Sequence, residues 1–492
     1  MKSILNNSTL RHVTILERLY DADDWVLVSD LAKSTGYPIR TIQHIIPTIN
    51  QDFAPVQIEY DPIKGLLLQL PTHLGFEYIY EHVYGTAYEF LLLETVFFHS
   101  GLSTNQLADK LYISPSTTTR VISKLNRKFR EKKIDLRIST KYHSLIGDEL
   151  TVRNFMFRFL REKYSLLTLP HPIEDIQAFQ NTVIECYAQG DLSLSYYELE
   201  FVTFIFVIVV TREKSGYSLE LLDQSAQQHP VFLHLLNSNV YTTYFTQSTG
   251  LPWSIPIVEQ IFSLFLRDRF FYSYEALTKA MTDRPELTLL VTRLKQLFDR
   301  IARRLGIEIP NLDTLIRKLV NYHVLFGDTN YILFDQHREF LCSVSKDYTF
   351  LMAVLVEEIS RFKFYDEFAW TTVSLNQTLQ LVVTQWDNLL DQVLLSQPKI
   401  SLLISSAFEP GYGEIIKEMI PSHSKANLTI HVSDSQTLLD FQNECDNYDI
   451  VLVSSNKLNL AHDNVIHFSP YPSSSDWKKL LNIINDISVG RK

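Results

Sequence analysis

Basic and small polar side chains recur on one face of the segment Ser116–Phe129 when it is read as a helix. At 3.6 residues per turn, Arg120, Ser123 and Arg127 project to the side on which Ser116 lies. Small side chains at a helix start allow close approach to a polyanion, and guanidinium groups further along can bind phosphates or base edges. The residues with this capacity here are Ser116, Thr117, Arg120, Ser123, Lys124, Arg127, Lys128 and, further along, Lys141.

The preceding residues supply the elements that would position this face. Ser103 and Gln106 have the spacing of a capping box, which predicts a short helix. Ser114 can cap a second helix, and Pro115 suits the first turn of that helix. Two helices joined by a short turn, the second of them basic, predict a helix-turn-helix that contacts DNA.

A hairpin pattern follows the basic helix. Leu136–Gly147 alternates like two short strands with Lys141 and Tyr142 near the tip, which predicts a wing along the DNA backbone or in the minor groove. A lone basic amphipathic helix is more often a solvated face of a helical bundle. The two caps, the turn, the polar face and the hairpin occur together here, and their combination favours DNA binding.

A similar order of segments occupies residues 1–70. Arg11–Tyr20, Val28–Gly36 and Pro38–Asn50 have helical patterns, and a hairpin pattern follows them. Pro47 should kink the third helix or end it early, because proline removes one hydrogen bond and clashes with a carbonyl one turn back. Two roles stay open for this module, which either contacts DNA itself or positions or dimerises the second module. In the first case the candidate contacts are Arg40, Gln43 and His44.

The charge of the chain is unevenly distributed. The net charge is −11. Residues 1–165 hold 20 basic and 18 acidic side chains, whereas the remainder holds 25 and 38. The segment Arg120–Lys141 alone has nine Lys or Arg residues and two acids. A basic patch on an acidic protein is compatible with electrostatic DNA binding.

Motifs of several enzyme classes are absent from the sequence. It contains no HExxH, no P-loop, no nucleophile elbow and no dinucleotide-binding glycine motif. The three cysteines form no CxxC pair, and glycine is scarce. The apolar run Phe201–Val210 is about half as long as a membrane span. We therefore expect a cytoplasmic protein that is not an enzyme, binds no metal or cofactor and does not enter a membrane.

The rest of the chain divides into a helical middle and an α/β tail. Residues 168–395 show helical apolar spacing, which a proline interrupts near Thr282–Leu287. Lys399–Ser405, Leu428–Val432 and Asp449–Ser454 are short apolar runs with helical patterns between them. This order predicts a small parallel sheet. The expected fold is mainly α, with two N-terminal winged helix-turn-helix modules, two all-helical domains and a C-terminal parallel-sheet domain.

This order of parts resembles the Mga/AtxA-type regulators of Gram-positive bacteria, which control virulence and metabolic genes. Its most specific features are the sequences RTIQHIIPTIN and LADKLYISPSTTTRVISKLN. The resemblance implies that the middle holds two PRDs, domains whose histidines are phosphorylated by carriers of the sugar phosphotransferase system. It also implies an EIIB-like tail that supports dimerisation. The expected domains are the two helix-turn-helix modules, the two PRD-like domains and the EIIB-like domain, at residues 1–70, 71–165, 168–285, 286–395 and 398–492.

The resemblance places histidine slots in both PRD-like domains. In the first, the slot seven residues before Arg212 holds Ile205, which cannot accept phosphate, and His229 and His234 do not match the pattern. In the second, the slot holds His323. We therefore expect one main phosphorylation switch at most, at His323. The alternative is an ordinary histidine with a satisfied hydrogen bond.

The tail lacks the cysteine nucleophile of a working EIIB domain. The loop after its first strand reads Ser405–Phe408, and a serine without an adjacent base is a poor phosphate acceptor. Cys445 lies in the second predicted helix of the tail. We expect a retained fold that supports a homodimer or larger assembly. The expected partners are promoter DNA, a second copy of the chain and phosphocarriers.

Two alternative functions stay open. An RNA-binding PRD antiterminator would begin with a small β-rich domain, whereas this chain begins with helices and a basic helix face. A phosphocarrier of the sugar system would require the missing cysteine.

Overall fold

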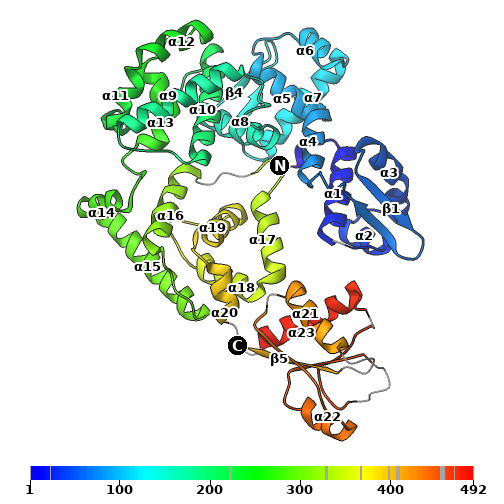
Figure 1. Ribbon diagram of the computed structural model, residues 1–492. Helices are drawn as coiled ribbons and strands as arrows, with labels where there is room; N and C mark the ends of the chain where they lie inside the picture. Colours follow the sequence, from blue (N-terminus) through cyan, green and yellow to red (C-terminus); the bar gives the residue numbers. More distant parts are fainter. Residues whose placement is uncertain are drawn as a thin grey trace. The chain divides into compact units, whose positions relative to one another are not determined.

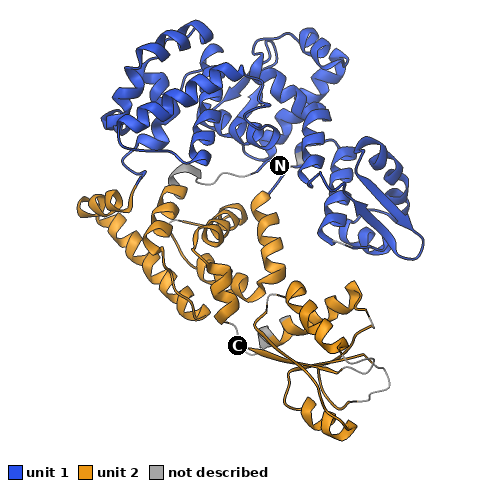
Figure 2. Ribbon diagram, in the orientation of Figure 1, with its two compact units in different colours: residues 1–272, 324–335 blue, residues 273–323, 336–492 orange. Residues whose placement is uncertain are grey.

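The computed structural model describes most of the chain and divides it into two compact units. The described residues are 2–22, 24–220, 224–326, 331–365, 368–396, 399–405, 411–424, 426–454, 460–469 and 471–490. Unit 1 holds residues 1–272 and 324–335, and unit 2 holds residues 273–323 and 336–492 (Figure 2). Within the described residues, no helix combines the length and apolar character that a membrane span requires.

The described part of the first module (residues 1–70) contains a short 3-10 helix and three α-helices, followed by an antiparallel hairpin (Figure 1). A bridge between Val26 and Leu66 adds a third short segment to the hairpin sheet. The buried side chains of Leu16, Ile42 and Ile49 lie in its core. Its elements are η1 (Lys2–Ile4), α1 (Asn7–Ala22), α2 (Val28–Thr35), α3 (Ile39–Asp52), β1 (Gln57–Asp61) and β2 (Gly65–Gln69).

Pro47 does not end α3, so of the two outcomes expected there, a kink or an early end, the early end does not occur. The helix continues to Asp52 and buries Ile42, Ile46 and Ile49 on one face. Burying each such side chain contributes about 1.5–3 kcal/mol. Together they outweigh the roughly 3 kcal/mol that an interior proline costs. Pro47 is exposed, so water can reach the helix face that lacks the hydrogen bond.

The second module (residues 71–165) repeats this order, with an additional helix before and after it. Phe90, Phe97, Phe129 and Phe159 are fully buried in its aromatic core. Its elements are α4 (Glu77–Thr86), α5 (Tyr88–Phe98), α6 (Thr104–Leu111), α7 (Pro115–Glu131), β3 (Leu136–Ile138), β4 (Leu145–Gly147) and α8 (Glu149–Lys163).

The middle of the chain is helical in both units, and the expected interruption lies between α14 and α15, where Pro285 begins the second helix. In unit 1 the elements are α9 (Ile173–Gln189), α10 (Tyr196–Lys214), η2 (Ser225–Gln228), α11 (Pro230–Leu236), α12 (Asn239–Thr249) and α13 (Ile255–Leu266). In unit 2 they are α14 (Tyr274–Asp283), α15 (Pro285–Leu305), α16 (Leu312–Phe326), α17 (Gln336–Asp347), α18 (Thr349–Ser360), α19 (Thr372–Gln385) and α20 (Leu389–Ser396).

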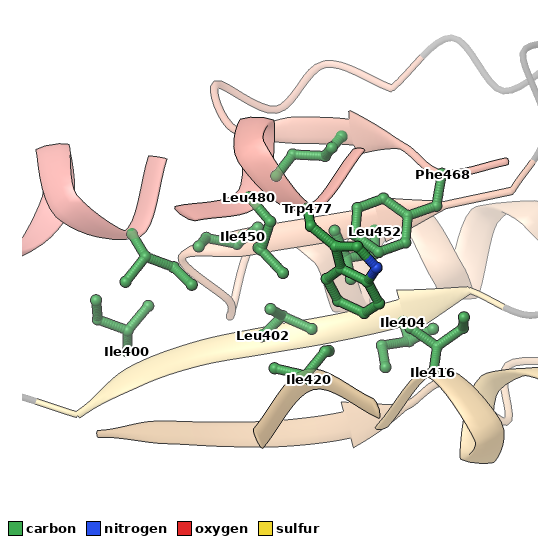
Figure 3. Packing of buried hydrophobic residues seen from close by; sticks show 12 residues of the cluster. Ile400, Leu402, Ile404, Ile416, Ile420, Ile450, Leu452, Phe468, Trp477 and Leu480 are labelled. Carbon is green, nitrogen blue, oxygen red and sulfur yellow. The ribbon is translucent and has the colours of Figure 1, made fainter. Parts of the chain in front are cut away.

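The tail is a parallel sheet with the strand order β6-β5-β7-β8. Trp477 and Phe468 pack beside Leu402 and Leu452 in its core (Figure 3). The sequence predicted three of these strands and missed β8, which is three residues long with only Ile466 buried. The elements are β5 (Ile400–Ser405), α21 (Tyr412–His423), β6 (Leu428–Val432), α22 (Leu438–Cys445), β7 (Ile450–Val453), β8 (Val465–His467) and α23 (Ser474–Gly490). The mainly α fold with a small α/β end is thereby confirmed.

Candidate nucleic-acid interface

Both helices of the second helix-turn-helix begin with the predicted caps. Ser103 and Gln106 form a complete capping box at α6. The Ser114 hydroxyl accepts a hydrogen bond from the Thr117 N–H at 3.1 Å, and Pro115 occupies the first turn of α7. These side chains satisfy amide groups that a helix start leaves without a partner. They therefore fix where α6 and α7 begin.

Helix α7 has one apolar and one polar face. Its buried residues are Thr118, Val121, Ile122, Leu125 and Phe129. On the other side Ser116, Arg120, Ser123 and Arg127 are exposed, whereas Thr117 and Lys128 are half-buried. Arg127 and Lys128 lie 3.7 and 2.9 Å from carboxylate oxygens of Glu131. Among the residues that the structure describes, no carboxylate pairs with Arg120.

Lys124 lies at the edge of this face and forms an ion pair with a residue of the same module. Its ammonium donates to the Glu89 carboxylate on α5 at 2.8 Å. The Glu89 side chain is 4% exposed and that of Lys124 is 23% exposed. A buried carboxylate needs a cation or hydrogen-bond donors. The ion pair therefore holds α7 against α5, and no local sequence pattern pointed to Glu89 as the partner of Lys124.

The predicted hairpin is a wing that is fixed to both helices. The Asn126 amide of α7 donates to the Ile138 carbonyl at 2.9 Å, and the Ile138 N–H donates to the Asn126 oxygen at 2.7 Å. Buried His143 donates from Nδ1 to the Ser139 carbonyl at 2.7 Å, and its Nε2 shares a hydrogen bond of 3.0 Å with the Thr104 hydroxyl of α6. These bonds leave the exposed tip residues Lys141 and Tyr142 in a defined place.

The third helix of the first module presents its candidate contacts to solvent. Arg40, Gln43 and His44 are exposed on α3, opposite the three buried isoleucines. Asn50 exchanges two hydrogen bonds with Ile58 of the hairpin, at 3.0 and 2.7 Å. Asn126 and Ile138 form the same pair of hydrogen bonds in the second module, and we call each pair an asparagine clamp. Neither asparagine clamp was predicted from the sequence. The shared pattern N-x-x-F, in INQDF and LNRKF, could have revealed them.

Arg212, in the first helical domain, is a structural anchor for the second module. It is 2% exposed and pairs with Glu149 at the start of α8, with Nη2 and Oε2 2.6 Å apart. Its Nη1 also donates to the Leu145 carbonyl of β4 at 3.1 Å. Ile205, in the histidine slot of the same helix, is half-buried. Arg212 therefore joins α10 to the hairpin strand β4 and to α8.

The remaining phosphorylation candidates differ in how far the structure describes them. His323 belongs to α16, but its side chain lies outside the described residues. His229 caps α11 by accepting from the Val231 N–H at 3.3 Å, and burial lowers its pKa. His234 is half-buried. In the tail, residues 406–408 lie outside the described residues, and burial raises the pKa of the Cys445 thiol on α22.

Family models and related proteins assign the chain to the same family. The Mga helix-turn-helix domain matches residues 73–160, and the PRD domain of the M protein trans-acting positive regulator matches residues 172–389. A protein of Streptococcus pneumoniae serotype 4 named as a trans-acting regulator is 21% identical over 457 residues, 92% of each chain. The capsule synthesis positive regulator AcpA of Bacillus anthracis is 24% identical over 215 residues, 43% of each chain. The chain therefore belongs to the Mga family of transcriptional regulators with helix-turn-helix and PRD domains.

Proposed function

We propose that the chain regulates transcription in the cytoplasm by binding promoter DNA, with α7 in the major groove and the β3–β4 hairpin as a wing. One observation carries the proposal: Ser116, Arg120, Ser123 and Arg127 are exposed on the face of α7 opposite its buried residues. Small side chains at the helix start and arginines further along suit this docking geometry. The edges of the proposed surface are Thr117, Lys128 and Lys141, and Lys124 contributes mainly by fixing α7.

We assign the first module a positioning role. Its helix α3 is exposed and accessible, but Arg40 is the only basic residue among its three candidate contacts apart from the titratable His44. Phosphate contacts supply most of the sequence-independent affinity for DNA. Arg40, Gln43 and His44 should therefore add little to affinity compared with α7.

The double variant Arg120→Ala/Arg127→Ala tests the proposal. Binding to a labelled AT-rich duplex, followed by fluorescence anisotropy, should weaken by about 100-fold, and the salt slope should fall by about 2. The matched control, Lys33→Ala/Arg303→Ala, removes two exposed cations elsewhere on the chain. Unchanged affinity of the arginine variant would show that the second module is not the DNA reader. Tighter binding to single-stranded RNA would favour an antiterminator.

Regulation is proposed to pass through His323 and through assembly. A phosphoryl group adds about −1.5 to −2 charges, which can reorganise a helical contact. His323→Ala and His323→Asp should differ in promoter output, and phosphohistidine mapping with the general phosphocarrier should find His323. Phosphate found only at His229 or His234 would contradict this. For assembly, a chain truncated after Ser396 should lose mass in light scattering if the tail holds the homodimer.

A further inference from the structure

A short apolar stretch, the latch segment Tyr331–Asp335, packs inside unit 1. Residues 324–335 belong to this unit, although the chain before and after them belongs to unit 2 (Figure 2). Ile332 and Leu333 are 1% and 0% exposed. The Phe334 ring lies 5.0 Å from the Tyr80 ring on α4. The latch segment therefore packs its apolar side chains into the core of unit 1 and is not a loop exposed to solvent.

One carboxylate on α8 binds the backbone of the latch segment. Glu162 accepts hydrogen bonds from the N–H groups of Ile332, Leu333 and Phe334, at 2.6, 2.8 and 3.1 Å. The Tyr84 hydroxyl donates to the same carboxylate at 2.7 Å. Successive backbone N–H groups can form an anion-binding concavity. Hydrogen bonds to an ionised acceptor are about twice as strong as neutral ones.

Glu162 lies where a negative charge is costly, so its hydrogen-bond donors are needed to stabilise the carboxylate. It lies in the last turn of α8, where the helix dipole disfavours a negative charge. Burial raises its pKa, and the hydrogen bonds from the latch segment and Tyr84 oppose that rise. Without the latch segment the carboxylate would keep one of its four donors, and two apolar side chains would lose their burial. Detaching the segment would therefore cost both the charge-assisted hydrogen bonds and the apolar burial.

The latch segment contacts the helix that joins the two helix-turn-helix modules. On α4, Tyr80 donates to Glu17 of α1 in the first module. One turn later Tyr84 donates to Glu162, at the end of the second module. The ring of Tyr80 and the partner of Tyr84 both contact the latch segment. Release would therefore alter the surroundings of the two tyrosines that bind α4 to both modules.

We propose that attachment of the latch segment to Glu162 transmits the state of the second PRD-like domain to the DNA-binding modules. The segment lies between α16 and α17 in the chain, so a rearrangement of these helices would displace it. Its release changes how α4 is held between the modules and thereby changes DNA affinity. The proposal rests on the proposed DNA-binding function and does not require that His323 is the phosphorylated residue.

Hydrogen exchange of the full chain tests the attachment. In Glu162→Gln, the amides of Ile332–Phe334 should exchange at least about tenfold faster, because three bonds lose their ionised acceptor. Phe334→Ala, which changes a half-buried side chain, should act in the same direction. The matched control is Glu94→Gln, since Glu94 binds Lys163 and Tyr164 at the same end of α8. The control should leave exchange of the latch segment unchanged.

DNA affinity of the same variants tests the transmission. It should change by at least about threefold in Glu162→Gln and Phe334→Ala and remain unchanged in Glu94→Gln. Unchanged exchange in both latch variants would overturn the attachment, and faster exchange with unchanged DNA affinity would overturn the transmission. If the unmodified chain does not bind DNA, the proposed function fails instead, and the exchange result still decides whether Glu162 holds the latch segment.

Discussion

The two helix-turn-helix modules share a backbone plan and differ in the charge of their third helix. In each module an asparagine of that helix bonds both backbone groups of one hairpin residue, Asn50 with Ile58 and Asn126 with Ile138. The two asparagines lie 76 positions apart, the same offset that separates α2 from α6. The geometry that presents the helix is therefore retained in both modules.

The exposed residues of the two helices have diverged. At the offset of 76 positions, Arg120 corresponds to His44, Arg127 to Gln51, and Lys128 to an aspartate. The fold depends on the buried positions and the asparagine clamp, whereas DNA affinity depends on exposed charges that the fold does not need. If the proposed function is correct, the first module keeps its shape while it lacks most of the cations that would bind phosphate on α7.

The largest difference between the modules should come from the asparagine clamps. Asn126→Ala and Asn50→Ala each leave two backbone groups without partners, which should lower the free energy of unfolding by about 1–3 kcal/mol. Only Asn126→Ala should also weaken DNA binding, by about tenfold, since it releases the wing beside the basic helix. Urea unfolding and fluorescence anisotropy measure the two effects. Equal losses of DNA affinity would contradict the division of roles.

The next effect concerns stability alone, at the position where Lys124 corresponds to Thr48 of the first module. Lys124→Met leaves the Glu89 carboxylate without its cation, and we expect a stability loss of about 1–3 kcal/mol. This is less than for a fully buried pair, because Lys124 keeps some exposure. Thr48→Met should change stability by less than about 0.5 kcal/mol. Glu89→Gln should restore stability to the lysine variant, and its failure to do so would exclude the ion pair as the cause.

The smallest effect should be a pH dependence of stability where the first module packs against α4, since the ring of His82 lies 4.7 Å from that of Phe53. Burial lowers the pKa of His12 and of His82 below the ordinary value of 6.5, and Asp52 opposes this only partly. The unfolded chain therefore binds protons more readily as the pH falls through about 6.5, and stability present at higher pH is lost. His12→Asn/His82→Asn should flatten this dependence in urea unfolding between pH 7.5 and 5.5. The control His44→Asn, on the exposed face of α3, should not.

The sequence by itself determined the features that depend on neighbouring residues. The caps at Ser103 and Ser114, the two faces of α7 and the hairpin pattern each lie within a few positions, so local spacing is sufficient to predict them. The same reasoning allowed an early end of α3 at Pro47, which does not occur, because the buried face of α3 outweighs the local cost of proline. It also missed β8, because a three-residue strand has too little pattern to detect.

The tertiary structure decided which charges remain available. Spacing alone put Lys124 near the proposed DNA-binding face, but its partner Glu89 lies 35 residues away in the chain. Glu162 looks like any other acidic residue near a helix end, yet its three backbone partners lie 170 to 172 residues further along, and Tyr84 lies 78 residues before it. Such pairs are set by desolvation, since a charge that becomes buried must find donors or counterions wherever the folded chain brings them. A local sequence pattern therefore cannot predict which partner a buried charge will have.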